Sequence, residues 1–166
     1  MRYIILFIYI IASSICFSCQ TKNVANDIIS KNKKLYNSLY KSNGNVFSLG
    51  SLSFEHSYMW SYSNDEINIY NLEKGKVISE KKIKLQNQGN NRWLQNPLKD
   101  DTGIDNCIAT DGFTLMYKVV NNDSYIERRF PVMYDCMKNS KYETDFFTKL
   151  IEDMNYYQIG WLRSNN

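Results

Sequence analysis

Hydrophobic and polar positions follow three patterns in succession along the chain. The first 18 residues are almost entirely apolar, with Arg2 as their only charge. From Val24 to about Ser42, apolar residues recur three, four or seven positions apart, which is the spacing of one helix face. From Val46 to Leu85 the spacing falls to two, which is typical of strands. The pattern therefore predicts a leader, a helix and a sheet, in that order.

Turn residues divide the period-two region into strands. Gly44 supplies the left-handed residue that commonly ends a helix. Short polar turns at 64–65 and 73–76 join neighbouring strands, and strands joined in this way are antiparallel. The alternation also predicts one buried face and one face in water. The predicted strands cover residues 47–54 (one strand or a bent pair), 58–63, 66–72 and 77–85.

A second hairpin is predicted further along the chain. Its strands, 112–120 and 124–130, flank the polar segment Asn121-Asn122-Asp123. If Asn122 and Asp123 are the two turn residues, the register gives compatible cross-strand pairs. These pairs are Lys118 with Glu127, Val119 with Ile126, and Leu115 with Phe130.

The last part of the chain predicts a second helix and one more strand. Ser140 to Glu143 has the form of a capping box, and we expect it to begin the helix. Residues 157–162 are expected to add a last edge strand. The fold class is therefore α+β, with an N-terminal helix, an antiparallel sheet of about five or six strands built from hairpins, and a C-terminal helix on one face. The apolar face of the second helix consists of Phe146, Phe147, Leu150, Ile151 and Met154.

Composition limits the broad class of protein. The chain has 166 residues, and 43% of them are hydrophobic, which suits one compact domain and is too apolar for a disordered chain. The net charge is +3 and the two signs are mixed along the chain, which argues against nucleic acid as a partner. We expect a signal peptide at 1–18, a tether at 19–26 and a single globular domain at 27–166.

The leader has the three-part layout of a secretory signal. A positive start at Arg2 is followed by about ten apolar residues and then by small residues that include Ser14 and Ser18. A membrane-spanning helix needs roughly 20 apolar residues, and this run is shorter. The chain becomes polar at Gln20, so we expect residues 1–18 to be removed.

Cys19 lies at this change of composition, directly after Ser18. Here the leader resembles that of bacterial lipoproteins, the substrates of lipoprotein signal peptidase. The resemblance implies cleavage before Cys19, a diacylglycerol on its thiol and fatty acylation of the new amino group. Gln20, in place of Asp, implies sorting to the outer membrane. Phe17 and Cys16 depart from the family pattern, which leaves open a plain secretory signal or an uncleaved N-terminal anchor.

Cys107 and Cys136 are the remaining pair in the mature chain if Cys19 carries lipid. In the predicted hairpin register, Cys107 and Cys136 are offset by about two residues from directly opposite positions. They lie just beyond the regular strand pairing, where Pro131 introduces a break. A disulfide between them would close a loop of about 28 residues and contribute roughly 3 kcal/mol. An oxidising periplasm would allow it to form. The alternative is two separate small core residues.

Residues 86–106 form a long polar connection, and such loops often carry function. Trp93 and the neighbouring Arg92 are the candidate ligand contacts, because an exposed tryptophan in a loop marks a contact site. The alternative for Trp93 is a place in the core. The acids at 100–105 concentrate oxygen atoms but lack the spacing of a calcium hand, so a solvated turn is expected and no metal is assigned.

The sequence contains few groups that could carry catalysis. It has one histidine, His56, beside Glu55, and neither a glycine-rich phosphate loop nor a Gly-x-Ser-x-Gly elbow. We therefore expect no cofactor and no enzymatic activity. The sequence favours a lipid-anchored cell-envelope module that binds a protein or a cell-wall glycan, for example as an inhibitor or immunity-type protein. The alternative is a small envelope hydrolase that uses carboxylates.

Overall fold

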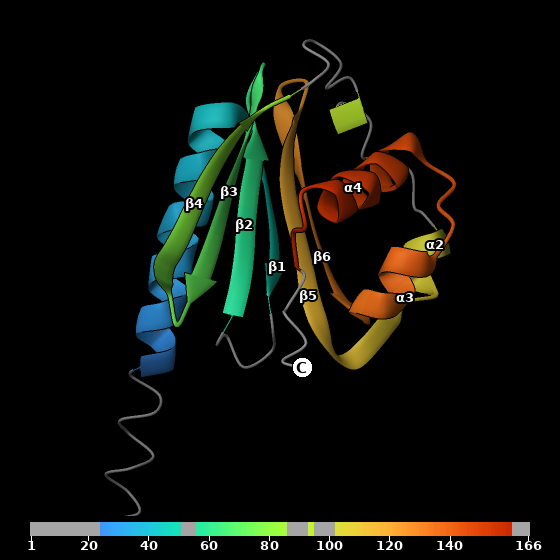
Figure 1. Ribbon diagram of the computed structural model, residues 1–166, viewed down its shortest axis with the longest axis horizontal. Helices are drawn as coiled ribbons and strands as arrows, with labels where there is room; N and C mark the ends of the chain where they lie inside the picture. Colours follow the sequence, from blue (N-terminus) through green and yellow to red (C-terminus); the bar gives the residue numbers. More distant parts are fainter. Residues whose placement is uncertain (1–23, 51–55, 86–92, 95–101, 161–166) are drawn as a thin grey trace, which may run out of the picture.

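The computed structural model describes residues 24–50, 56–85, 93–94 and 102–160 (Figure 1). Within these ranges the strands are β1 (Asn45–Gly50), β2 (His56–Tyr62), β3 (Glu66–Glu73), β4 (Lys76–Lys84), β5 (Ile108–Asn121) and β6 (Ser124–Val132). The helices are an N-terminal helix over 24–43, α2 (Thr102–Asp105), α3 (Tyr134–Asn139) and α4 (Asp145–Tyr156). The predicted α+β class, with its two principal helices and its sheet, is confirmed.

The sheet has six antiparallel strands in the order β4-β3-β2-β1-β5-β6. The first four strands follow one another as a meander, and the β5–β6 hairpin attaches to the free side of β1. The first strand in sequence therefore lies in the middle of the sheet. Phe47 of β1 is paired with Trp60 of β2 on one side and with Tyr117 of β5 on the other.

The junction between the N-terminal helix and β1 forms as the sequence predicts. Gly44 has φ +68, and its N–H donates to the Tyr40 carbonyl at 2.8 Å, which ends the helix. The Asn45 side chain then replaces a rung of the ladder. Its Nδ2 donates to the Tyr62 carbonyl and its Oδ1 accepts from the Tyr62 N–H, both at 2.7 Å. These bonds fix the start of β1 against the end of β2.

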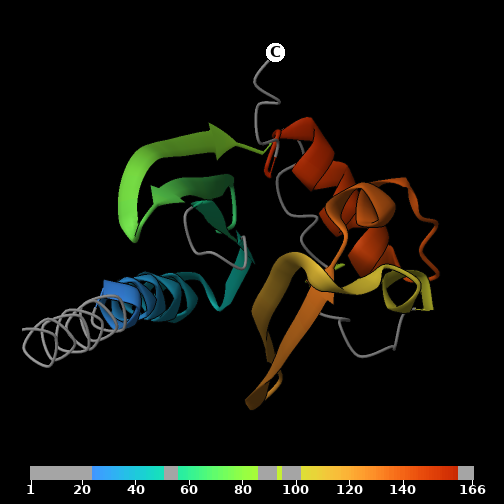
Figure 2. The same cartoon turned by 90° about the horizontal axis from the view of Figure 1, so that it is seen from below.

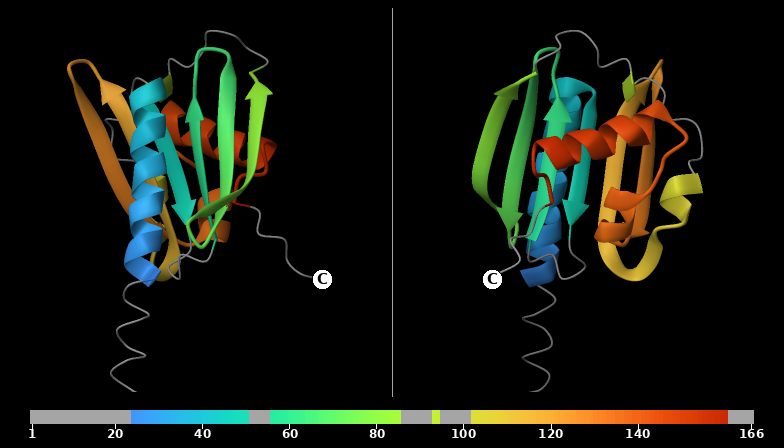
Figure 3. Two further views of the ribbon diagram at one scale, coloured as in Figure 1. Left: turned by 90° about the vertical axis from the view of Figure 1, so that its left-hand side faces the viewer. Right: turned by 45° about the vertical axis from the view of Figure 1, so that its right-hand side comes forward.

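The N-terminal helix covers one face of the sheet mainly with its second half (Figure 3). Tyr36 and Leu39 are buried against Val46, Met59 and Leu72. Nearer its start the side chains are much more exposed, with Val24 61% and Ile29 44% exposed. The predicted apolar face is therefore buried only in its C-terminal half, because the first turn extends beyond the strands that the helix covers.

Helix α4 covers the opposite face, so the sheet lies between two helical layers (Figure 2). All five apolar residues predicted for this helix are buried, from Phe146 to Met154. In β1, Val46 packs towards the N-terminal helix and Phe47 towards α4, and neither is exposed. The prediction of one face in water is therefore wrong for the centre of the sheet. The physical reason is that the apolar stripe of the N-terminal helix also needs a surface to cover.

The predicted hairpin register is confirmed. In β5 and β6, Lys118 pairs with Glu127, Val119 with Ile126 and Leu115 with Phe130. Asn122 occupies the first turn position with φ +50. The β3–β4 turn also has two left-handed residues, Lys74 and Gly75, which is the type I′ geometry favoured by twisted hairpins.

The break at the open end of this hairpin lies in β5 and not at Pro131. Pro131 stays in register opposite Thr114, since proline is tolerated on an edge strand. The register shifts between Ile108 and Phe113, and both of these residues pair with Val132. The four residues between them form the bulge, and Gly112 lies close to the Val132 backbone.

The start of the C-terminal helix was predicted four residues too early. Thr144 is the N-cap of α4, and its hydroxyl accepts from the Phe147 N–H at 3.4 Å. Ser140 instead follows the last residue of α3, a helix that the sequence did not predict. The Ser140 hydroxyl donates to the Cys136 carbonyl of α3 at 2.9 Å, so it is engaged with the preceding helix and does not cap the following one.

A last edge strand was predicted at 157–162, and the structure describes residues 157–160 of it. These four residues do not form a strand. Residues 157–160 form turns, and Gly160 has φ +84. Ile159 is fully buried and anchors this segment on the core. The sheet edges are therefore β4 and β6.

We predict that Gly112→Ala lowers the free energy of unfolding by at least about 1–3 kcal/mol, as overpacking against a fixed neighbour does. A Cβ at this position would lie 2.1 Å from the Val132 carbonyl oxygen, so the bulge or β6 has to move. Urea unfolding measures the change. Gly50→Ala is the matched control, because the nearest atom to its Cβ is a side-chain carbon of Ser57 at 3.3 Å. Equal stability of the two variants would contradict the prediction.

Candidate functional site

Two of the predicted site residues lie outside the described residues. These are Cys19, the proposed lipid attachment point, and Arg92 in the long loop. The structure does describe Cys107, Cys136 and Trp93. None of the helices within the described ranges combines the length and the apolar character needed to cross a membrane.

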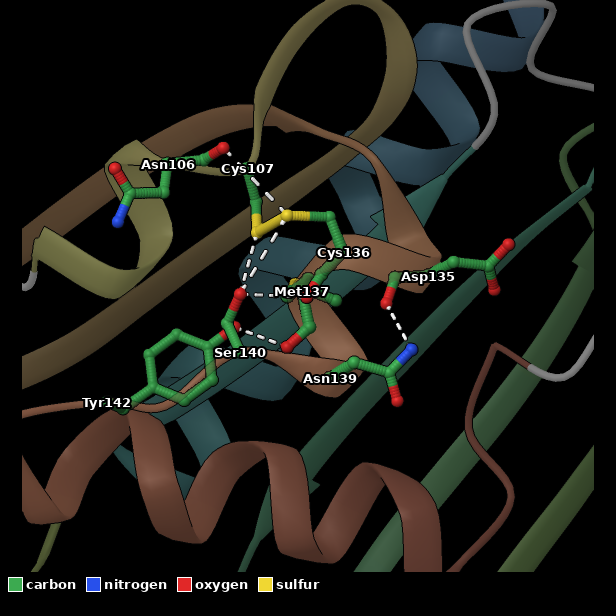
Figure 4. The surroundings of a disulfide bond; sticks show 8 residues. All are labelled: Asn106, Cys107, Asp135, Cys136, Met137, Asn139, Ser140 and Tyr142. Atoms are coloured by element: carbon green, nitrogen blue, oxygen red, sulfur yellow. Dashed lines mark hydrogen bonds between the residues drawn. A yellow bond between two sulfur atoms is a disulfide. The ribbon is translucent and has the colours of Figure 1, made fainter.

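Cys107 and Cys136 form a disulfide, as the hairpin register predicted (Figure 4). Their Cα atoms are 5.5 Å apart, within the range that a disulfide requires. Cys107 directly precedes β5 and is fully buried, and Cys136 lies on α3. The bridge therefore fixes α3 to the start of the longest strand.

The surroundings of the disulfide are well supplied with hydrogen bonds. The Met133 N–H donates to the Cys107 carbonyl at 2.9 Å, which continues the strand pairing to the start of α3. The Ser140 oxygen lies 3.0 Å from Cys107 Sγ, and the Tyr142 hydroxyl donates to the Met137 carbonyl (Figure 4). This network holds both ends of α3, so we interpret the disulfide as structural.

Trp93 lies against the core on the α4 side of the sheet. Its ring centroid is 5.3 Å from that of Tyr62, 5.6 Å from Phe146 and 6.3 Å from Phe47. The side chain is half-buried, and the adjacent Leu94 is 7% exposed. Much of the ring thus serves packing, as the alternative interpretation held. A ligand-contact role for the remaining exposed part stays a prediction.

The residues considered for catalysis or metal binding do not converge among the described residues. His56 is half-buried at the start of β2, where its strand partner is Glu73. Asp105 is exposed at the end of α2. Glu55 and the acids at 100–101 lie outside the described residues. In the described ranges, no three histidine, cysteine or acidic side chains gather where they could hold a metal ion.

A buried polar cluster between β2 and α4 was not predicted. Trp60 and Tyr62 are at most 1% exposed, and the indole Nε1 and the phenol oxygen make no hydrogen bond of ordinary geometry. Asp153 of α4 lies close enough to Tyr62 to affect its ionisation. Burial, reinforced by this carboxylate, raises the pKa of Tyr62 well above its ordinary value.

Asp153 is itself in an unfavourable place for a charge. Burial raises its pKa, while the Tyr62 hydroxyl and Lys149 act in the opposite direction. Burial therefore opposes the loss of a proton from Tyr62 and from Asp153 alike. Sequence alone indicates only that Trp60 and Tyr62 share one strand face. It does not show that an acid of a distant helix lies opposite them.

A second unpredicted cluster joins the N-terminal helix to the β5–β6 hairpin. Lys118 Nζ lies 3.8 Å from the centre of the Tyr125 ring and 4.6 Å from that of Tyr40. It is also 3.8 Å from a Glu127 carboxylate oxygen, and its side chain is only 15% exposed. A partly desolvated cation between two rings contributes about 1–2 kcal/mol. This cluster positions the helix against the hairpin.

We predict that removing the disulfide lowers the free energy of unfolding by roughly 3 kcal/mol, the chain-entropy value for a loop of this length. The double variant Cys107→Ala, Cys136→Ala should have the same urea midpoint in the presence and absence of reductant. The wild-type protein should fall to a similar midpoint only when reduced. An unchanged midpoint on reduction, or two free thiols in the unreduced protein, would contradict a stabilising bridge.

Comparison of the chain with protein-family models, with curated proteins and with solved structures gives no match.

Proposed function

We propose that this chain is a lipid-anchored cell-envelope protein that binds a protein partner without catalysing a reaction. Its lipid attachment point is Cys19, and the outer membrane is the expected location. An inhibitor or immunity-type protein, which blocks a toxin or an envelope hydrolase, is the specific form that we favour. The small size of the domain, its proposed lipid anchor and the scarcity of catalytic groups in the sequence support this form.

The observation that carries the proposal is the Cys107–Cys136 disulfide. Structural disulfides persist in oxidising compartments such as the bacterial periplasm and are rare in reducing cytosol. The leader at 1–18 predicts export on independent grounds, from its charge and its apolar run. Two unrelated features of the chain therefore favour the same compartment.

The start of the described structure suits a short attachment to a membrane. The N-terminal helix begins by residue 24, five positions after Cys19, and its first turn lies at one end of the molecule (Figure 1). A single acyl chain binds a bilayer only marginally, whereas two or three chains on one cysteine hold a protein durably. Such an anchor would keep the domain close to the lipid surface.

The partner is expected to contact the long loop at 86–106 and the α4 side of the sheet. Trp93 and Leu94 of this loop pack on that side. Trp93 is half-buried, so part of its ring is open to a partner beside α4.

We predict that Cys19→Ser moves the protein from the membrane fraction to the soluble fraction of the envelope. The serine hydroxyl does not accept the lipid, so the anchor is lost while the described fold is unchanged. Cell fractionation and immunoblotting measure the shift, and Cys16→Ser is the matched control that should remain at the membrane. Retention of the Cys19 variant at the membrane would show that an uncleaved helix holds the chain.

We further predict that crosslinking in intact cells of the source organism captures one protein partner in a stoichiometric complex. Insoluble cell wall should not retain the protein. Retention by cell wall that Trp93→Ala abolishes would instead establish the glycan-binding alternative. Turnover of an envelope substrate by the purified protein would overturn the non-enzymatic proposal.

A further inference from the structure

Positive charge is concentrated on one side of the domain. The N-terminal helix carries four lysines and one acid, and β4 carries four lysines and one acid, so each has a net charge of +3. Lys74 in the β3–β4 turn adds one more. All these lysines are exposed. We call this region the basic side; its lysines are Lys31, Lys33, Lys34, Lys41, Lys74, Lys76, Lys81, Lys82 and Lys84.

Negative charge is concentrated across the sheet. The segments 102–106 and 133–160, which contain α2, α3 and α4, carry six acids and three lysines, a net charge of −3. We call this region the acidic side. In Figures 1 and 2 the helix and β4 lie together on one side, and α2–α4 lie on the other. Its acids are Asp105, Asp135, Glu143, Asp145, Glu152 and Asp153.

The basic side is also the side on which the chain enters the domain. Gly75 of the β3–β4 turn packs on the helix, since a Cβ there would lie 3.1 Å from the Ile28 Cα atom. The turn and the first helical residues therefore lie at the same end of the molecule (Figure 3). Only a few residues of chain separate Cys19 from the start of the helix. A bilayer that holds Cys19 would therefore lie close to this end of the molecule.

Apolar side chains accompany the lysines. Of the nine large hydrophobic residues that are most exposed in the described ranges, four lie on the basic side. Val24 and Ile29 belong to the helix, and Val77 and Ile78 to β4. Exposed aliphatic side chains among lysines are typical of surfaces that lie at a lipid interface, where the lysines contact anionic headgroups and the aliphatic groups enter the boundary region.

We propose that the N-terminal helix and β4 lie against an anionic lipid surface and that α2–α4 face away from it. This proposal rests on the proposed anchoring, which would hold the helix start beside the bilayer. Successive residues of a strand point to opposite faces, so the edge strand β4 meets the surface edge-on and its lysines reach lipid phosphates from both faces, beside those of the helix. The acidic side is repelled by the same surface, so the two sides together orient the domain.

Charge argues against a second copy of the chain on this side, and position argues against an acidic protein. A second copy placed face to face would bring lysines against lysines, which opposes self-association. An acidic protein partner has the right charge, but nothing would place it preferentially at the end where the chain enters. A membrane that binds the anchor is necessarily at that end.

The test uses the purified protein with its anchor, reconstituted on two kinds of vesicle. One kind is phosphatidylcholine alone, and in the other about one lipid in three is phosphatidylglycerol, which supplies the negative surface potential. A membrane-impermeant acylating reagent modifies exposed lysines, and mass spectrometry reads the extent at each position. Lys138, Lys141 and Lys149 of the acidic side are internal controls.

On anionic vesicles we expect at least about threefold lower modification of the basic-side lysines than on neutral vesicles, with the three controls unchanged. High salt should remove the difference, because it screens surface charge. The variant Lys33→Gln, Lys34→Gln, Lys82→Gln should lose the protection at the remaining basic-side lysines. The matched variant Lys138→Gln, Lys141→Gln, Lys149→Gln should keep it.

Uniform modification of both sides on anionic vesicles would overturn the proposal, and so would protection of the acidic side. Protection of the basic side only after an envelope protein is added would assign this side to a protein. Flotation separates the two proposals. Flotation with anionic but not with neutral vesicles would show that the protein lacks the lipid anchor. The labelling pattern on the anionic vesicles would still show which side of the domain contacts lipid.

Discussion

The aromatic contacts of Phe47 are the interaction on which the rest of the structure depends. This side chain lies in the central strand and is fully buried, and its ring centroid is 5.5 Å from Trp60, 6.1 Å from Tyr117 and 6.2 Å from Phe146. One side chain thus touches both neighbouring strands and the helix that covers them. Burial of a ring of this size contributes about 2–3 kcal/mol, and each aromatic pair adds to it. This contact therefore ties α4 to the centre of the sheet.

Local signals predicted the elements of the fold well. Asn122-Asp123 is a short turn with a well-defined geometry, so it set the register of β5 and β6 and placed Cys107 near Cys136. Gly44 ended the first helix for the same local reason. The bulge in β5 and the helix α3 could not be predicted, because both depend on a bridge and on packing between residues far apart in sequence. Thr144 was overlooked as a cap since Ser140 offers a similar local pattern.

The basic and acidic sides could not be predicted from the sequence, because they depend on the three-dimensional arrangement of the elements. The sequence shows lysines in the first helix and in β4, and acids towards the C-terminus, but it does not show which of them share a side. The three-dimensional arrangement places the helix and β4 on one side of the molecule and α4 on the other (Figures 1 and 2). The same holds for Lys118, whose two tyrosine partners come from the first helix and from β6. Trp93 illustrates the converse, since its place in a polar loop gave no sign of the core rings of Tyr62 and Phe146 against which it packs.

The central position of β1 has a consequence for how the chain reaches its final state. Asn45 pairs with Val119, which lies 74 positions later in the chain. The pairing of β1 with β5 therefore cannot form until β5 has been synthesised and has reached β1. Before that point only the meander of β1 to β4 can form, with one side of β1 unpaired. Pairings between such distant segments are slow compared with local hairpins. A chain that crosses a membrane unfolded would therefore complete its sheet only after translocation, and oxidation of the two cysteines would make that late step hard to reverse.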